Sequence, residues 1–310
     1  MERKIKFSDL TSTIENAYNE LSKNTEGEIP EAFGKDNAGI FGITLILNDG
    51  RKYNIGDTAT AFTLGGMANV PIMVQLLTQY SVEELTAKLA GKCCCAGKCD
   101  KDALKGKHFH KRGLRELSLV EPTGDIDGKM DIMSDMMTSL MASSPVMSDT
   151  LYKARMAENI NEGAVNLLAE AEYFLYDDAA LTLDAYARLH SMQVTTEQLA
   201  AMGATITADG VNPVTKQNVF DGKNSANIIA NMAVSGPHKA GRRWLTITGI
   251  PAVASYGGGM LAVVPGLGAI AAFSPELNAM GIPVKAALSL KKIFTDLQLN
   301  AFASARVAVE

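Results

Sequence analysis

Hydrophobic and polar positions alternate with two different periods along this chain. Apolar residues recur every three or four positions over Asp9–Lys23, which predicts an amphipathic helix with Ser8 or Asp9 as its N-cap. Gly39–Leu47 then alternates large apolar residues with small or polar ones, as a strand does. An Asn-Asp-Gly turn signal follows, so Lys52–Gly56 is expected to return as the partner strand.

Helical periodicity dominates the middle of the chain. It begins at Met67–Tyr80, where Pro71 is tolerable only in the first turn of a helix. The clearest later helical segments are Asp149–Tyr176, Asp178–Met192 and Thr195–Met202.

Strand-like character returns after this helical middle. Trp244–Ile250 is expected to be a strand, and a glycine-rich segment follows it. There, Met260–Val264 and Ala269–Phe273 are short apolar runs bounded by turn residues, which favours the two buried strands of a hairpin. A last helix is expected over Val284–Leu299. The simplest packing places Ile43–Leu47 and this hairpin in one antiparallel sheet.

The order of elements predicts a fold of the α/β (α+β) class. We expect one antiparallel sheet sandwiched by helices, with an all-helical lobe inserted into the chain. The whole chain, 1–310, then forms a single unit, with a sheet lobe over 1–66 and 205–310 and a mostly helical lobe over 67–204. A stretch rich in cysteine and lysine, 91–117, interrupts the helical lobe and differs in composition from both flanks.

Composition and charge narrow the class of protein. A chain of 310 residues with 47% hydrophobic residues can bury a large core. Its net charge of −5 argues against a surface for nucleic acid or anionic membranes. The first residues lack an apolar core of signal-peptide length, and the longest apolar region is too short to span a bilayer. We therefore expect a soluble, cytoplasmic protein.

Two glycine-containing motifs lie in the second half of the chain. Met202–Thr205 precedes the G-V-N-P-V-T run of Gly210–Thr215, and Gly257–Pro275 contains G-G-G-M-L-A-V-V-P-G and I-A-A-F-S-P. In this order they resemble the M-G-A-T…G-G-V-N-P and G-G-G-I-x-A-V-x-P-G…I-A-x-F-S-P motifs of the bacterial serine-dependent glutaminases. The resemblance covers about 43–299, apart from part of 91–117. It implies a β-lactamase-like fold, no required cofactor, and a homodimer or homotetramer.

The chemistry of that family depends on one serine and one lysine. The resemblance implies conversion of L-glutamine and water to L-glutamate and ammonia through an acyl-enzyme, with the serine of S-x-x-K as nucleophile and the lysine as base. In this sequence Gly66 stands at the serine and Asn69 at the lysine. Glycine has no side chain to acylate, and an amide cannot act as a base near neutral pH. The sequence therefore predicts that glutamine hydrolysis is absent or strongly impaired.

Most other positions that the family uses for its substrate are also changed. The replacements are Asp131 for an asparagine, Arg155 for a glutamate, Glu162 for an asparagine, Thr246 for a tyrosine, and Val253-Ala254-Ser255 for K-S-G. Tyr186 matches a family substrate residue, although a half-buried helix tyrosine is the simpler explanation of it. Tyr256 replaces a valine, but its backbone N–H and that of Gly66 can still form an oxyanion hole. These three residues are the candidate binding groups for a small amino-acid-like ligand.

Two other serines could in principle replace the missing nucleophile. Ser289 begins an S-x-x-K sequence, but it lies in the expected terminal helix, remote from the family's cleft. Ser255 adjoins the triple glycine, yet no lysine or histidine is near it in sequence. Neither is a convincing nucleophile.

A second candidate site is separate in sequence from the positions that the family uses for catalysis. Thiols and imidazoles gather in one short stretch: Cys93, Cys94, Cys95, Cys99, His108 and His110. They could hold Zn²⁺ or Cu(I), but C-x-x-C pairs are missing, and a solvated loop with free thiols is the simpler explanation. Nearby lysines would also lower thiol pKa values and favour redox reactivity.

Three classes of function therefore remain open. The first, which the sequence favours, is a catalytically silent homologue that binds a small molecule or regulates a partner. The second is a glutaminase or another amidohydrolase with rewired catalytic groups. The third is a metal or redox protein that works through Cys93–His110.

Overall fold

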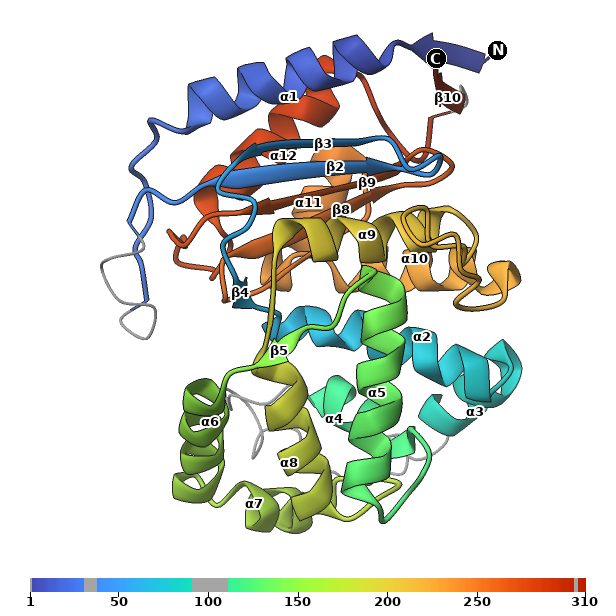
Figure 1. Cartoon of the computed structure of the whole chain (residues 1–310). Coiled ribbons are helices and arrows are strands. Elements are labelled where there is room, and N and C mark those ends of the chain that lie inside the picture. Colours follow the sequence, from blue (N-terminus) through green and yellow to red (C-terminus); the bar gives the residue numbers. More distant parts are fainter. Residues whose placement is uncertain (1, 31–37, 91–110, 304–305) are drawn as a thin grey trace. The chain divides into compact units, whose positions relative to one another are not determined.

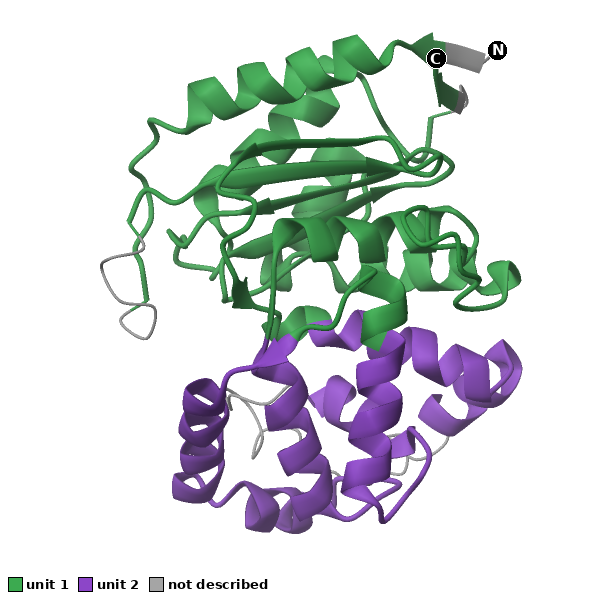
Figure 2. Ribbon diagram, viewed as in Figure 1, with its two compact units in different colours: residues 1–67, 137–145, 193–310 green, residues 68–136, 146–192 purple. Residues whose placement is uncertain are grey.

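The computed structural model describes residues 2–30, 38–90, 111–303 and 306–310. The chain divides into two compact units (Figure 2): unit 1 comprises 1–67, 137–145 and 193–310, and unit 2 comprises 68–136 and 146–192. In the described part of the chain, no helix is both long enough and apolar enough to cross a membrane.

Unit 1 is built on a five-stranded antiparallel sheet. Its strand order is β3 (Lys52–Gly56), β2 (Gly42–Leu47), β9 (Gly268–Phe273), β8 (Gly259–Val264) and β7 (Ala252–Ala254). Ile43 pairs with Ala272 across β2 and β9, and Ala262 pairs with Ile270 across β8 and β9. The predicted hairpin, and its union with the N-terminal strand in one sheet, are confirmed.

Helices cover both faces of this sheet (Figure 1). On one face lie α1 (Phe7–Leu21) and α12 (Val284–Asp296), whose apolar residues share a core with Ile43, Leu45 and Leu47 of β2. Successive strand residues point to opposite faces, so Thr44 faces the other side. There its hydroxyl forms a 2.8 Å hydrogen bond with that of Thr196. The sheet is therefore buried on both faces, and all six residues of β2 are buried.

The helix on that second face is α9 (Thr196–Thr207), which begins with a capping box between Thr195 and Gln198. It packs closely because Gly203 has no side chain. A Cβ atom there would lie 2.6 Å from Cβ of Ala269 and 2.7 Å from Cδ1 of Leu261. This contact places α9 in unit 1, whereas the predicted helical lobe ran from 67 to 204.

Three local predictions differ from the structure. Trp244–Ile250 was expected as a strand, but most of it lies in helix α11 (Gly241–Thr248), where Trp244 and Thr248 are buried one turn apart and Ile247 is half exposed. Helix α1 begins at Phe7 with Lys6 as its N-cap, so Ser8 and Asp9 lie inside the helix.

The third difference concerns Asp149–Tyr176, which is not one helix. It forms α6 (Asp149–Asn161) and α7 (Ala164–Glu170). Between them Gly163 adopts a left-handed conformation with φ of 61°, which a continuous right-handed helix cannot contain.

The remaining elements complete the two units. Unit 1 also contains β4 (Phe62–Thr63), η4 (Gly222–Asn224), α10 (Ser225–Ser235), η5 (His238–Ala240), and the parallel pair β1 (Glu2–Ile5) and β10 (Arg306–Val309). Unit 2 contains α2 (Asn69–Gln79), α3 (Val82–Ala90), α4 (Lys111–Leu119), β5 (Val146–Met147) and α8 (Ala179–His190). Three elements cross the boundary in sequence: η3 (Gly65–Ala68), α5 (Ile126–Met141) and β6 (Met192–Val194). Pro71 lies in the first turn of α2, as predicted.

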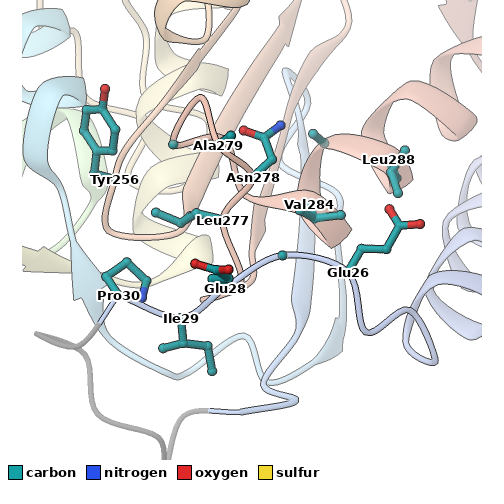
Figure 3. A pocket seen from close by; sticks show the side chains of 13 residues that line it. Glu26, Glu28, Ile29, Pro30, Tyr256, Leu277, Asn278, Ala279, Val284 and Leu288 are labelled. Carbon is teal, nitrogen blue, oxygen red and sulfur yellow. The ribbon is translucent and has the colours of Figure 1, made fainter.

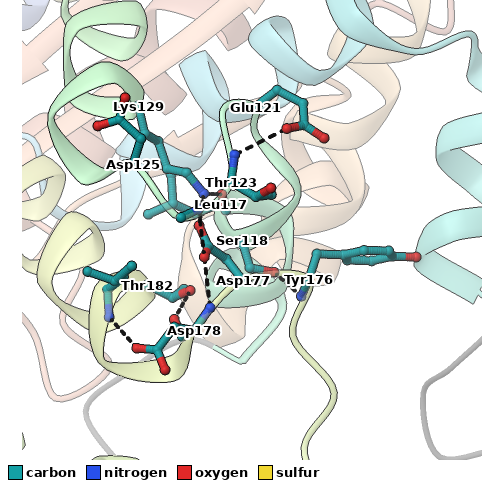
Figure 4. A network of polar contacts seen from close by, with 12 residues as sticks. Leu117, Ser118, Glu121, Thr123, Asp125, Lys129, Tyr176, Asp177, Asp178 and Thr182 are labelled. Carbon is teal, nitrogen blue, oxygen red and sulfur yellow. Dashed lines mark hydrogen bonds and ion pairs between the residues drawn. The ribbon is translucent and has the colours of Figure 1, made fainter.

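A buried ion pair joins three elements of unit 2 (Figure 4). Nζ of Lys129 on α5 lies 2.8 Å from Oδ2 of Asp177 and also donates to the carbonyl oxygen of Leu117 on α4. The two side chains are only 2% and 6% exposed. Oδ1 of Asp177 accepts hydrogen bonds from the backbone N–H groups of Gly124 and Asp178, and Asp178 in turn caps α8. This network fixes the start of α8 against α4 and α5.

The environment of Asp177 sets its protonation. Burial by itself raises the pKa of the carboxyl, but hydrogen bonds from Lys129, Asp178 and Gly124 outweigh burial and hold the pKa below its ordinary value. Because the pKa is lowered in the folded state, the contribution of the carboxylate to stability is present above its unfolded pKa of about 3.9. That contribution is lost as the pH falls through the folded pKa.

Lys129→Met should leave the Asp177 carboxylate buried without its cation and lower the free energy of unfolding by about 3–5 kcal/mol at neutral pH. Urea denaturation followed by circular dichroism measures this loss. The deficit should shrink as the pH is lowered toward the acid range, where the carboxyl takes up a proton. Lys223→Met is the matched control, because its ion pair with Asp221 is exposed, and it should leave the midpoint unchanged. An equal loss in both variants would contradict a special role for the buried pair.

Candidate functional site

The position that the family resemblance assigns to the nucleophile lies in η3, directly after β4. Gly65 adopts a left-handed conformation with φ of 51°, and a Cβ atom there would lie 2.5 Å from Oγ of Ser255. Gly66 is different: among the described residues outside its immediate chain neighbours, no heavy atom lies within 4 Å of where its Cβ would be. The backbone therefore leaves room for a side chain at Gly66, although the sequence supplies none.

The hydroxyl of Ser255 is part of the architecture of unit 1. Ser255 is fully buried, and its Oγ donates to the carbonyl oxygen of Thr63 at 2.9 Å while accepting from the N–H of Gly257 at 2.9 Å. These bonds tie the glycine-rich turn to β4. Because both its donor and an acceptor site are occupied, Ser255 is not a poised nucleophile.

Tyr256 occupies the next position of the same turn. In the part of the chain that the structure describes, its backbone N–H makes no hydrogen bond, so this donor is available. The residue is 56% exposed, and its ring stacks on the ring of His238, with centroids 4.1 Å apart. Tyr256 thus offers a backbone donor, as an oxyanion hole requires, and an outward aromatic ring.

The candidate residues of unit 2 meet at Gly113 on α4. A Cβ atom on Gly113 would lie 2.5 Å from Oδ1 of Asn69 and 3.0 Å from the hydroxyl oxygen of Tyr186. Oδ1 of Asn69 is buried, and no described residue donates a hydrogen bond to it. Tyr186 is 5% exposed, so it is buried in α8, not half-buried, and its ring lies against His190 at a centroid distance of 3.9 Å. The structure therefore brings Asn69 and Tyr186 together.

Arg155 adds a positive charge to the same unit. It lies on α6, and its Nε is buried with no described hydrogen-bond partner. Burial lowers the pKa of the guanidinium, while the charge of Glu158 and the nearby Tyr186 act in the opposite direction. Arginine nevertheless stays protonated in proteins. A cation therefore stands near Tyr186, at the position where the resemblance implies a glutamate.

The other substituted positions offer little chemistry. Asp131 is an exposed residue of α5, and Glu162 is the C-cap of α6. The hydroxyl of Thr246 is exposed on α11 and donates to the carbonyl oxygen of Arg242 at 2.8 Å. Val253 and Ala254, in the segment that replaces K-S-G, are buried in β7.

The S-x-x-K sequence of the last helix is not a catalytic pair. Ser289 is fully buried, and its Oγ donates to the carbonyl oxygen of Ala286 at 2.9 Å. Lys292 forms ion pairs with Glu20 and Asp296. The expectation that this motif is unrelated to catalysis agrees with these contacts.

The predicted metal site lies outside the described residues. This applies to all its proposed ligands: Cys93, Cys94, Cys95, Cys99, His108 and His110. Within residues 2–30, 38–90, 111–303 and 306–310, no group of three or more His, Cys, Asp or Glu side chains could hold a metal ion.

Comparison with known proteins shows the family to which the chain belongs. The sequence profile of the glutaminase family matches residues 114–302. A glutaminase of Parabacteroides distasonis is 31% identical over all of this chain and 99% of its own length, and a glutaminase of Bacteroides fragilis is 31% identical over the same shares. The chain belongs to the glutaminase family.

Solved structures agree with this assignment at the level of the fold. A protein described as a probable glutaminase, ybaS, superposes with a TM-score of 0.85 at 24% identity, covering 97% of this chain and all of its own. A probable glutaminase from Bacillus subtilis, complexed with 6-diazo-5-oxo-L-norleucine, gives a TM-score of 0.78 at 20% identity over 97% of this chain and all of its own. The predicted fold class, a β-lactamase-like arrangement of an antiparallel sheet and helices, is confirmed.

Sequence reasoning missed three residues at these positions. Gly113 separates Asn69 from Tyr186, His190 lies against Tyr186, and His238 stacks on Tyr256. His190 follows Tyr186 by one helical turn, so its contact could have been predicted from i, i+4 spacing. Nothing local in the sequence indicates the other two contacts.

Two neighbouring glycines should respond differently to alanine. Gly65→Ala should lower stability by at least about 1–2 kcal/mol, the cost of a left-handed conformation for a residue with Cβ, because Oγ of Ser255 also obstructs it. Gly66→Ala should change stability by no more than about 0.5 kcal/mol. Thermal unfolding of both variants beside the unmodified protein measures the difference. Equal destabilisation would show that the space at Gly66 is not open.

Proposed function

We propose that this chain is a glutaminase-family homologue that does not hydrolyse L-glutamine at a rate useful to a cell. One observation carries the proposal: the position assigned to the nucleophile is Gly66, which has open space where a side chain would stand and no atom to acylate. Ser255 and Ser289 do not replace it, because both hydroxyls are buried and engaged in hydrogen bonds.

The residue assigned to the base supports the same conclusion. Asn69 carries a neutral amide, which cannot remove a proton from a hydroxyl or thiol near neutral pH. A nucleophile and its base act as one unit, and loss of either typically costs several orders of magnitude in rate. Here both are absent, so the available Tyr256 N–H could stabilise an oxyanion only if some other group had formed it.

The charge near Tyr186 also weighs against glutamine as the ligand. At the position of Arg155 the resemblance implies a glutamate, which would attract the α-ammonium group of an amino acid. Arg155 repels that group and attracts a carboxylate. The function that we propose is binding, without turnover, of a small amino-acid-like ligand held through its carboxylate rather than its ammonium group, or else a regulatory role. A cytoplasmic location and a homodimeric or homotetrameric state stay predictions.

The direct test is ammonia release from purified full-length protein over a range of L-glutamine concentrations. We expect no saturable activity above about 1 s⁻¹, the low end of ordinary turnover numbers. A saturable rate above that value would contradict the proposal and require a nucleophile elsewhere. A curated family member assayed in parallel confirms that the conditions support turnover.

Restoring the two missing groups should not be sufficient. Gly66→Ser with Asn69→Lys should still turn over glutamine below about 1 s⁻¹, because Arg155 disfavours the substrate's ammonium group. Adding Arg155→Glu should then give more activity than the double variant. If the double variant alone reached ordinary turnover, Arg155 would not prevent binding of the substrate's ammonium group, and the role that we assign to Arg155 would be wrong.

The glutamine analogue 6-diazo-5-oxo-L-norleucine offers a covalent test for a nucleophile. One solved structure is described as the covalent complex between the B. subtilis glutaminase YbgJ and 5-oxo-L-norleucine, formed by reaction with 6-diazo-5-oxo-L-norleucine. We propose that this chain, without a nucleophile at Gly66, does not form the adduct.

A further inference from the structure

Unit 1 contains a pocket that the proposed function does not use. It has a volume of about 960 Å³ and lies between three segments (Figure 3). One wall is the extended stretch Glu26–Pro30, a second is the loop from Leu277 to Gly281, and a third is the first turn of α12 from Val284 to Leu288. Tyr256 lies at one end of the pocket. Cavities of this size hold small organic ligands.

The ionisable groups that line this pocket favour a cation. Glu26 and Glu28 contribute carboxylates, and among the described residues that line the pocket there is no lysine, arginine or histidine. Neither carboxylate forms an ion pair with any described residue. Two unpaired negative charges beside low-dielectric walls create a potential that attracts positively charged ligands.

Two features that could instead attract an anion are largely engaged in contacts within the protein. At the N-terminus of α12, the N–H of Val284 donates to the carbonyl oxygen of Glu276 at 2.8 Å, and the N–H of Ala286 donates to Oγ of Ser274 at 3.3 Å. The ammonium group of Lys285 is 2% exposed and lies 3.0 Å from Oε1 of Glu276. The charge of Lys285 is therefore neutralised within the protein, and these donors are not free to bind a ligand.

The remaining walls suit an apolar body. Leu277 and Val284 are buried beneath the pocket, and Ile29 and Leu288 also line it. Stacking on His238 holds the Tyr256 ring in place, and an aromatic ring attracts organic cations. In Figure 3 Tyr256 and Glu26 lie at opposite ends, with Glu28 between them. This arrangement suits an elongated molecule.

We propose that this pocket binds an organic cation, a primary amine or guanidinium carried on an apolar chain. The carboxylates of Glu26 and Glu28 pair with the cationic group, and the apolar wall and Tyr256 contact the chain. Free diamines and the side chain of a lysine residue share this chemistry. The proposal is independent of glutamine hydrolysis, and its test measures binding rather than ammonia.

Isothermal titration of the full chain with three five-carbon ligands tests the charge preference. The ligands are 1,5-diaminopentane, 1,5-pentanediol and glutarate, which differ in the charge of their end groups. We expect saturable binding of the diamine, at least tenfold weaker binding of the diol and no binding of glutarate. Equal binding of diol and diamine, preferred binding of glutarate, or no saturable binding of any cationic ligand would overturn the proposal.

Nα-acetyl-lysine N-methylamide separates the two sources of the amine. Tighter binding than the diamine identifies a lysine side chain as the ligand, and weaker binding identifies a free diamine. Either result supports the cationic class, provided that the neutral diol binds more weakly.

Single substitutions locate the binding. Glu28→Gln and Tyr256→Ala should each weaken diamine binding by about tenfold or more, the equivalent of about 1.4 kcal/mol. Glu83→Gln removes the same charge from an exposed position on α3 in unit 2 and should leave the affinity unchanged. Unchanged melting temperatures show that each variant is folded. If Glu28→Gln and Glu83→Gln weakened diamine binding equally, the affinity would depend only on the net charge of the protein, and this result would contradict the proposed site.

Discussion

The antiparallel pairing of β2 with β9 is the interaction on which unit 1 depends. It joins residues 42–47 to residues 268–273, so more than two hundred residues of chain lie between the paired strands. Both faces of the resulting sheet are then covered, by α1 and α12 on one side and α9 on the other. Such non-local pairing bears a loop-closure cost that only extensive burial offsets. The glycine-rich turn and Tyr256 take their positions from this sheet.

This dependence separates two kinds of site component. Backbone components follow from the fold, and the available N–H of Tyr256 persists because Ser255 holds the turn against β4 through Thr63. Side-chain components do not follow from the fold. Gly66 preserves the space for a nucleophile without supplying one, and Asn69 places an amide beside Tyr186. These observations support the proposal that the chain keeps the family's fold without the family's catalytic groups.

The sequence was sufficient for features that depend on local periodicity. Alternation in Ile43–Leu47 and the short apolar runs of the hairpin predicted the central strands, because alternation indicates a strand with one buried face and a short apolar run indicates a strand buried on both faces. The strand prediction for Trp244–Ile250 was wrong because it relied on the preference of aromatic and β-branched residues for strands. The two buried residues of α11 in this segment, Trp244 and Thr248, are four positions apart, which is a helical spacing. The position of α9 and the contact of His238 with Tyr256 depend on long-range packing, which no local pattern records. Family motifs located Gly66 and Asn69, but could not indicate Gly113 between Asn69 and Tyr186.

The central claim is that no residue of this chain acts as a nucleophile that bonds covalently to a glutamine analogue. Intact-mass spectrometry after incubation with 6-diazo-5-oxo-L-norleucine tests it most directly, because a covalent adduct registers even when turnover is slow. We expect the unmodified protein to keep its mass, whereas a curated glutaminase treated in parallel gains one adduct. A stoichiometric adduct on the unmodified chain, mapped by peptide fragmentation to a residue near the glycine-rich turn or η3, would contradict the claim.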